Sequence, residues 1–180
     1  MSTTKARQQW QSIAPINTNR LDIRTFRPDD AAFILSLLRQ PSFLQYIGER
    51  GVSDLASAAD YIEQRLHVSY QQHGFGLLAV CDRQGQCMGM CGLVRREGLP
   101  EPDLGYAFLP QFWHQGYAVE AGQAVLDDAC QRLGLQSVLA VTALDNQASI
   151  AVLQRLGFVA AGEVTLAPAT SPSRLFRWRA

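Results

Sequence analysis

Apolar and polar positions change their spacing several times along the first half of the chain, and each spacing predicts one kind of element. Residues 21–26 alternate between apolar and polar side chains, which is typical of a half-buried strand. Pro28-Asp29-Asp30 begins a helical pattern that Pro41 is expected to end, with apolar positions at Ala31, Ile34, Leu35 and Leu38. Ser53 is expected to cap a second helix that Gly74 ends. The predicted apolar face of this helix consists of Leu55, Ala59, Ile62, Leu66 and Tyr70.

The second half of the chain predicts more strands than helices. Strand patterns lie at residues 76–81, 87–95, 103–109, 137–142, 158–164 and 175–179, and helical patterns at 118–133 and 147–156. Residues 82–85 are expected to join the first two of these strands as a hairpin loop. Because the order mixes hairpins with crossovers, we expect an α+β fold with a central mixed sheet of about seven strands and helices packed on its faces.

Residues 1–19 differ from the rest of the chain. They carry Lys5 and Arg7 but no acidic residue, and their large apolar side chains are Trp10, Ile13 and Ile16. A basic amphipathic arm or a transit-like segment would fit this composition, but a loosely ordered tail fits it better. We therefore expect a tail at residues 1–19 and a single domain at residues 20–180.

Composition excludes several classes of function. The sixteen basic and sixteen acidic residues cancel, so no net charge attracts the chain to nucleic acid or to an anionic membrane. No apolar run approaches the roughly 18 residues of a membrane-spanning helix. The four cysteines form no CxxC pair and have no histidine cluster beside them, so we expect reduced thiols and no metal site. A cytoplasmic protein is the expectation.

The most informative segment is Trp113-His114-Gln115-Gly116-Tyr117-Ala118-Val119-Glu120-Ala121. It places a glycine turn at the start of a helix, where free backbone N–H groups and the positive end of the helix dipole favour a phosphate group. Gly116 lets the backbone approach a ligand closely because it has no Cβ. An ATP site of the P-loop type would need a lysine beside this turn, and there is none.

Six short segments, in order, resemble motifs of the GNAT acyltransferase superfamily, and within it the RimJ/RimL branch of ribosomal-protein N-terminal acetyltransferases. At the front, residues 18–24 (TNRLDIR) resemble "T-x-RL-x-LR" and residues 29–31 resemble "DDA". In the middle, Leu104-Gly105-Tyr106 resembles "IGY", and residues 113–121 resemble "WGKGYATEA". At the back, Asn146 and Ser149 match "NxxS", and residues 156–158 match "LGF". The resemblance implies a GNAT-type fold with a splayed pair of parallel strands.

The resemblance also implies acetyl-CoA as the cofactor. By carry-over, the backbone of Phe108 and Leu109 pairs with the pantetheine arm. The N–H groups of Gln115, Gly116, Tyr117 and Ala118 hold the pyrophosphate, and Trp113 and His114 are also expected to bind the cofactor. Trp113 stands where the superfamily usually has glutamine or arginine, so a cation for the phosphates must come from elsewhere.

Two more cofactor contacts follow from the resemblance. Asn146 is expected to bond to the cofactor arm. An ordinary N-cap with Ser149 at the third helical position is the alternative, and the two roles can coexist. Arg155 is expected near the phosphates.

Acyl transfer from a thioester to an amine needs a neutral amine, donors for the oxyanion and a proton for the leaving thiolate. The branch resemblance suggests Ser149 as the proton source, against a role in helix capping alone. Asp103 is the first candidate for the base and Glu101 the second, against solvated carboxylates at a strand end. The charge of Glu120 is explained by the dipole of its helix. His73 and His114 are weaker candidates, since surface or packing roles explain them.

The acceptor amine is expected to enter between the two N-terminal helices and the loop at residues 168–172. Of the residues that could line this entrance, about two are expected to face the ligand and the others the core: Phe43, Tyr46, Ile47 and Tyr106. Together the patterns predict an acetyl-CoA-dependent N-acetyltransferase in which a protein N-terminus or small-molecule amine attacks directly within a ternary complex. The alternative is a non-catalytic sensor that binds acyl-CoA. A homodimer is expected from the branch.

Overall fold

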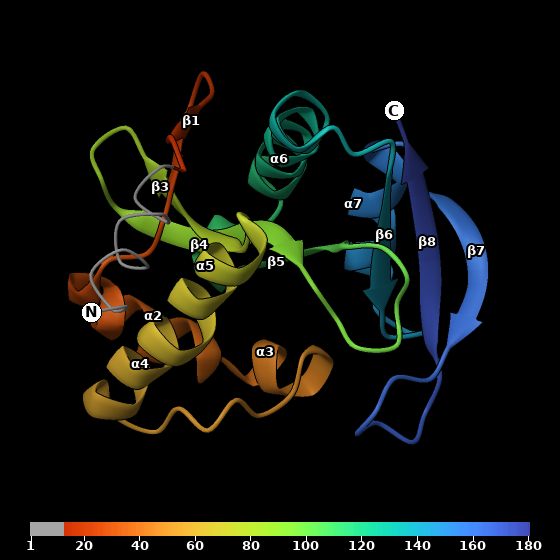
Figure 1. Ribbon diagram of the computed structural model, residues 1–180. Helices are drawn as coiled ribbons and strands as arrows, with labels where there is room; N and C mark the ends of the chain where they lie inside the picture. Colours follow the sequence, from red (N-terminus) through yellow and green to blue (C-terminus); the bar gives the residue numbers. More distant parts are fainter. Residues whose placement is uncertain (1–12) are drawn as a thin grey trace, which may run out of the picture.

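The computed structural model describes residues 13–180 and contains one mixed eight-stranded sheet (Figure 1). The predictions for Lys5, Arg7 and Trp10 lie outside these residues. The strands are β1 (Ile16–Asn17), β2 (Leu21–Arg24), β3 (Leu77–Asp82), β4 (Cys87–Val94), β5 (Asp103–Phe108), β6 (Ser137–Thr142), β7 (Val159–Val164) and β8 (Ser173–Arg179). Their order in the sheet is β1-β2-β3-β4-β5-β6-β8-β7, and every neighbouring pair is antiparallel except β5 and β6.

The parallel pair divides the sheet into two halves. β5 and β6 share a single residue pair, Asp103 with Leu139, whereas β6 pairs with β8 along its whole length from Ser137 to Thr142. The two strands therefore meet where β5 begins and diverge toward their carboxyl ends. This confirms the predicted mixed, mostly antiparallel sheet with a splayed parallel pair.

The eighth strand is β1, which lies in the segment expected to be a tail. Ile16 and Asn17 pair with Ile23 and Asp22 of β2, and Ile13 is buried. Two residues are too few to show a strand period, so the pattern of the sequence could not reveal β1. The division into a tail at residues 1–19 and a domain at residues 20–180 stays a prediction.

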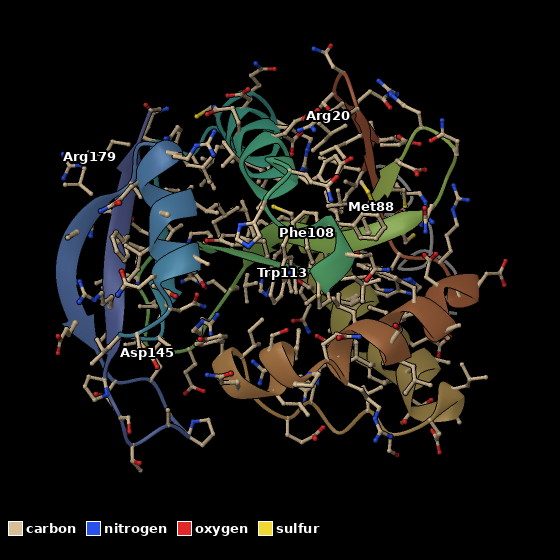
Figure 2. The ribbon with its side chains drawn as sticks, turned by 180° about the vertical axis from the view of Figure 1, so that it is seen from behind. Arg20, Met88, Phe108, Trp113, Asp145 and Arg179 are labelled. Atoms are coloured by element: carbon tan, nitrogen blue, oxygen red, sulfur yellow. The ribbon has the colours of Figure 1, made fainter. Side chains whose placement is uncertain are left out.

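Helices cover both faces of the sheet. Figure 1 shows α2–α5 on one face of β1–β5, and α6 and α7 lie on the opposite face, which Figure 2 presents from behind. The first group consists of η2 (Pro28–Asp30), α2 (Ala31–Leu38), α3 (Pro41–Tyr46), α4 (Leu55–Tyr61), η3 (Ile62–His67) and α5 (Val68–His73). The second consists of η4 (Pro110–Phe112), α6 (Tyr117–Leu133) and α7 (Gln147–Arg155).

Two details of the N-terminal helices differ from the prediction. α2 ends at Leu38, and Pro41 begins a further helix, α3, that was not predicted. The missing N–H and the fixed φ of proline are favourable at the first position of a helix. The cap of α4 is Asp54 and not Ser53, because the Asp54 carboxylate accepts a hydrogen bond from the Ser57 N–H at 2.8 Å.

The apolar face predicted for residues 55–70 is correct only in its later part. Ile62, Leu66 and Tyr70 are buried, whereas Leu55 is 57% exposed and Ala58 takes the buried position in the first turn. Gly74 ends the helix with φ +70, as predicted, and Gly134 ends α6 with φ +67. No helix within residues 13–180 is long and apolar enough to cross a membrane. All four cysteines are free.

Candidate active site

The space between β5 and β6 is bordered by backbone groups that the sheet does not use. The N–H of Leu109 donates to the Met88 carbonyl at 3.0 Å, so Leu109 faces β4. Hydrogen-bonding direction alternates along an antiparallel strand, and Tyr106 and Phe108 therefore direct their N–H and C=O groups toward β6. Because the two strands have already diverged there, these groups are available to an extended ligand.

Trp113 occupies one of these positions. Its indole Nε1–H donates to the Phe108 carbonyl at 2.8 Å, and its side chain remains half-exposed. Figure 2 shows Phe108 and Trp113 close together near the start of α6. Both backbone groups of Leu109 already have partners, Met88 and the N–H of Phe112, so its predicted pairing with the pantetheine arm would require breaking one of these bonds. The Phe108 N–H and the backbone N–H and C=O groups of Tyr106 remain available to pair with the pantetheine arm.

The glycine turn has the backbone conformation of an anion-binding loop. His114 has φ +59, which is rare and strained for a residue with a side chain, and Gly116 has φ +80 and precedes the first residue of α6. No side chain caps this helix, so its first N–H groups, beginning at Tyr117 and Ala118, remain without intrahelical partners. Consecutive N–H groups in left-handed and turn conformations form a concave site that suits a phosphate.

A cation lies beside this turn, and the sequence did not identify it. The Arg20 guanidinium donates from Nη1 to the Gln115 carbonyl at 2.9 Å and pairs with Glu120 at 2.6 Å. It also lies 4.4 Å from the centre of the Tyr117 ring. Arg20 belongs to residues 18–24 (TNRLDIR). In the sequence analysis this segment supports the resemblance to the family and predicts no site residue. No local pattern connects it to a turn almost one hundred residues away.

The start of α7 faces β5 across the diverging strands. Asn146 caps the helix by accepting from the Ser149 N–H at 3.1 Å, so the capping role is present. The Tyr106 hydroxyl lies 2.8 Å from the Ser149 Oγ and donates to the Ser149 carbonyl at 3.1 Å. Burial raises the pKa of the Tyr106 phenol, which therefore stays protonated at neutral pH. Tyr106 thus contacts the predicted proton source, a contact that its prediction as an acceptor-lining residue did not include.

Asp103 lies where the two strands meet. Its carboxylate is 1% exposed and accepts from Arg96 Nη2 at 3.0 Å and from Nε at 3.3 Å. Burial raises the pKa of Asp103, and the Arg96 charge and hydrogen bonds oppose the shift without cancelling it. Since side chains alternate along a strand, Asp103 points to the opposite face of the sheet from Tyr106.

The second base candidate, Glu101, has other partners. It accepts hydrogen bonds from Ser137 at 2.8 Å and from Arg177 at 3.0 Å. Within residues 13–180, no group of three or more histidine, cysteine or acidic side chains is placed to hold a metal ion.

The remaining predicted residues are distributed over core and surface. Phe43 is buried in the core at 4% exposure, whereas Tyr46 and Ile47 at the end of α3 are each 37% exposed. Arg155 is exposed in the last turn of α7. His73 is exposed and stacks on Phe75.

Several known proteins are similar to this chain. YkkB of Bacillus subtilis is 27% identical over 146 residues, covering 78% of this chain and 82% of that protein. The structure of an acetyltransferase from Agrobacterium tumefaciens is 27% identical, with a TM-score of 0.79 over 94% of this chain and 96% of that one.

Two more distant structures show the shared fold. The first, from Salmonella typhimurium, is an acetyltransferase that modifies the N-terminal serine of ribosomal protein L7/L12; it is 16% identical, with a TM-score of 0.78 over 93% of this chain and 99% of that one. The second is the microcin C7 self-immunity acetyltransferase MccE in complex with acetyl-CoA and AMP; it is 15% identical, with a TM-score of 0.77 over 94% of this chain and 99% of that one. The family model for the GNAT acetyltransferase domain matches residues 20–159, and the chain belongs to this family.

Proposed function

We propose that this protein transfers an acetyl group from acetyl-CoA to a primary amine, by direct attack within a ternary complex. The observation that carries this proposal is the Tyr106–Ser149 hydroxyl pair, which lies beside the unpaired strand N–H groups. A binding module needs the phosphate turn but has no use for a protonated hydroxyl pair beside the splayed strands. A transferase has a use for both.

The residues present fit acetyl-CoA. Gly116 has no Cβ, and one built there would approach only Arg20, so the backbone of the turn is open to a phosphate. The Tyr106 N–H and C=O groups would hold an amide-bearing arm in the manner of an added strand, which leaves the Phe108 N–H for the thioester carbonyl. When bound, acetyl-CoA supplies the acetyl group as a thioester and leaves as a thiol. MccE, which shares the fold, was solved with acetyl-CoA, and this supports the assignment.

Four groups of this chain divide the chemistry. Ser149 donates a proton to the leaving sulfur and takes one back from water, while Tyr106, 2.8 Å away, holds the serine hydroxyl in place. The Phe108 N–H donates to the developing negative oxygen. Asp103 accepts a proton from the amine side through water, since it points to the face opposite Tyr106 and its pKa is raised by burial.

The acceptor that fits best is an amine of low pKa, such as a protein N-terminus. An α-amine with a pKa of about 7.8 loses its proton at pH 7 for roughly 1 kcal/mol, whereas lysine at about 10.4 costs roughly 4.6 kcal/mol. Both base candidates are held by arginines, Asp103 by Arg96 and Glu101 by Arg177, and such bases suit the easier deprotonation. The fold neighbour that modifies the N-terminal serine of L7/L12 supports the same class.

The test is thiol release from acetyl-CoA with N-terminal peptides, lysine peptides, polyamines, amino acids and aminoglycosides as acceptors. Turnover on N-terminal peptides or low-pKa amines, reduced by Ser149→Ala, supports the proposal. A clear preference for lysine peptides contradicts the acceptor class. Tight acetyl-CoA binding with no thiol release on any amine supports the alternative of an acyl-CoA sensor. The homodimer expected from the branch stays a prediction that light scattering checks.

A further inference from the structure

Arg20 makes three kinds of contact with the glycine turn and the first turn of α6. Its Nη1 donates to the Gln115 carbonyl at 2.9 Å, and its Nε donates to Glu120 Oε2 at 2.6 Å. Its guanidinium lies over the Tyr117 ring at 4.4 Å. Figure 2 shows Arg20 beside α6, on the side of the molecule that carries the first strands. One planar group therefore connects the phosphate turn and the first turn of α6 to the N-terminal segment.

The contact with Gln115 fixes the direction of a neighbouring N–H group. The Gln115 C=O and the Gly116 N–H belong to one trans peptide unit, so they point in opposite directions. When the carbonyl is held toward Arg20, the Gly116 N–H is held pointing away from Arg20. Arg20 therefore acts on the anion site through the backbone, and need not touch the anion.

Glu120 is held as firmly as Arg20. Its Oε1 accepts from the Thr18 hydroxyl at 2.5 Å and from the Arg20 N–H at 3.1 Å, in addition to the guanidinium. Burial acts to raise the pKa of Glu120, but the hydrogen bonds from Thr18 and Arg20 outweigh it and lower the pKa overall. Glu120 is therefore ionised at neutral pH, which keeps the Arg20 fork in one orientation.

We infer that Arg20, oriented by Glu120, is a positioning residue that sets the diphosphate-binding geometry of the turn at residues 113–118. This rests on the acetyl-CoA binding of the proposed function. This arrangement compensates for the absence of glutamine or arginine at position 113. The cation comes from the residue before β2, and it fixes the backbone of the turn. A carboxylate so close to an anion site would otherwise oppose binding, and here its charge is committed to Arg20.

Binding of CoA and of S-acetylpantetheine, measured by calorimetry, tests this inference. CoA has the diphosphate and S-acetylpantetheine has no phosphate at all. Arg20→Gln and Glu120→Gln should each weaken CoA binding by on the order of tenfold, because a hydrogen bond to a charged group is lost, and leave S-acetylpantetheine unchanged. Arg20→Lys should weaken CoA binding similarly, because lysine keeps the charge and lacks the planar fork.

Glu120→Gln separates positioning from charge. If Arg20 acted only as a positive charge, removing the nearby carboxylate would tighten CoA binding and Arg20→Lys would retain it; either result overturns the inference. An equal loss for CoA and S-acetylpantetheine also overturns it. Arg132→Gln is the matched control, because Arg132 likewise bridges a carboxylate, Asp128, and a carbonyl, that of Gly74, but at the other end of α6.

A readout without ligand keeps the inference independent of the proposed function. The Gly116 amide resonance should shift in Arg20→Gln and Glu120→Gln and stay in place in Arg132→Gln, whether or not CoA binds. An unmoved Gly116 resonance overturns the inference. A wild-type protein that binds no CoA contradicts the proposed function, and the resonance still decides the role of Arg20.

Discussion

Replacing Tyr106 with phenylalanine and Ser149 with alanine, singly and together, shows whether their hydroxyls work as one unit. The two oxygens lie 2.8 Å apart, and the Tyr106 hydroxyl also donates to the Ser149 carbonyl. In the proposed arrangement Tyr106 acts only through Ser149. Once the serine hydroxyl is gone, loss of the tyrosine hydroxyl should therefore have no further effect on acetyl transfer.

The expected magnitudes follow from the chemistry of the leaving group. A positioned proton donor contributes roughly 10²–10⁴-fold, and a thiol with a pKa of about 8.5 needs the lower end of that range. Ser149→Ala should lower kcat about 100-fold, or roughly 2.7 kcal/mol, and Tyr106→Phe about tenfold. The double variant should resemble Ser149→Ala, which gives a coupling free energy of roughly 1.4 kcal/mol.

The assay is thiol release at saturating acetyl-CoA on the best acceptor of the panel. Ser69→Ala is the control, because it removes another half-buried serine hydroxyl that donates a hydrogen bond, to the Phe75 carbonyl at 2.9 Å, far along the chain from both residues. A double variant about 1,000-fold below wild type would show that the two hydroxyls act independently, and it would refute the idea that Tyr106 acts only through Ser149. A Ser149→Ala variant within threefold of wild type would refute the proton-donor role itself.

Three other substitutions test separate features. Asp103→Asn should lower kcat/KM by about 100-fold or more if the carboxylate is the base; a loss below threefold, with altered thermal stability, identifies a structural ion pair with its arginine. Gly92→Ala should destabilise the fold by about 3 kcal/mol or more in urea unfolding, because a Cβ would overlap the Gly76 carbonyl. The paired Gly105→Ala meets only flexible side-chain ends at 3.3 and 3.4 Å and should cost under about 1 kcal/mol, so equal effects would contradict the steric argument. Burial acts to raise the pKa of Asp30, but hydrogen bonds from Arg24 and from the Arg27 N–H outweigh burial and lower the pKa overall. The ionised carboxylate therefore stabilises the fold above pH about 4, and this stabilisation is lost as the pH falls through the lowered pKa. Asp30→Asn should therefore cost about 3 kcal/mol at pH 7, less at pH 3 and below; a pH-independent cost would contradict this origin.

The sequence predicted the elements whose period is long enough to read. The strand at 137–142 is correct to the residue, and the helix ending before Gly134 begins one residue earlier than predicted. β1 has two residues and α3 has six, begun by a proline, and neither shows a period before it ends. The cap at Asp54 needed the position of Ser57 as well as residue type, since aspartate and serine are both favoured caps.

The candidate site rests on predictions from local segments, and its long-range contacts were not predicted. The glycine turn and Asn146–Ser149 are short segments, and their spacing alone indicates a turn and a helix start. Arg20 and Glu120 are one hundred residues apart, and Tyr106 and Ser149 are forty-three apart. Contacts between side chains so far apart in the sequence depend on sheet register and on how far two strands diverge. The periodicity of a single segment predicts neither of these.

The divergence of β5 and β6 places two strand edges in the middle of a sheet. An unpaired edge is a template for the strands of other chains, and proteins commonly protect such edges with bulky or charged side chains. Trp113 gives partial protection, because its indole occupies the Phe108 carbonyl. A ligand that lies between the strands would cover the remaining groups, so colloidal stability should depend on ligand occupancy. Stored without coenzyme, the protein should aggregate by pairing the exposed edges of β5 and β6 with strands of other copies. Coenzyme A should prevent this aggregation, because it would pair with the same backbone groups.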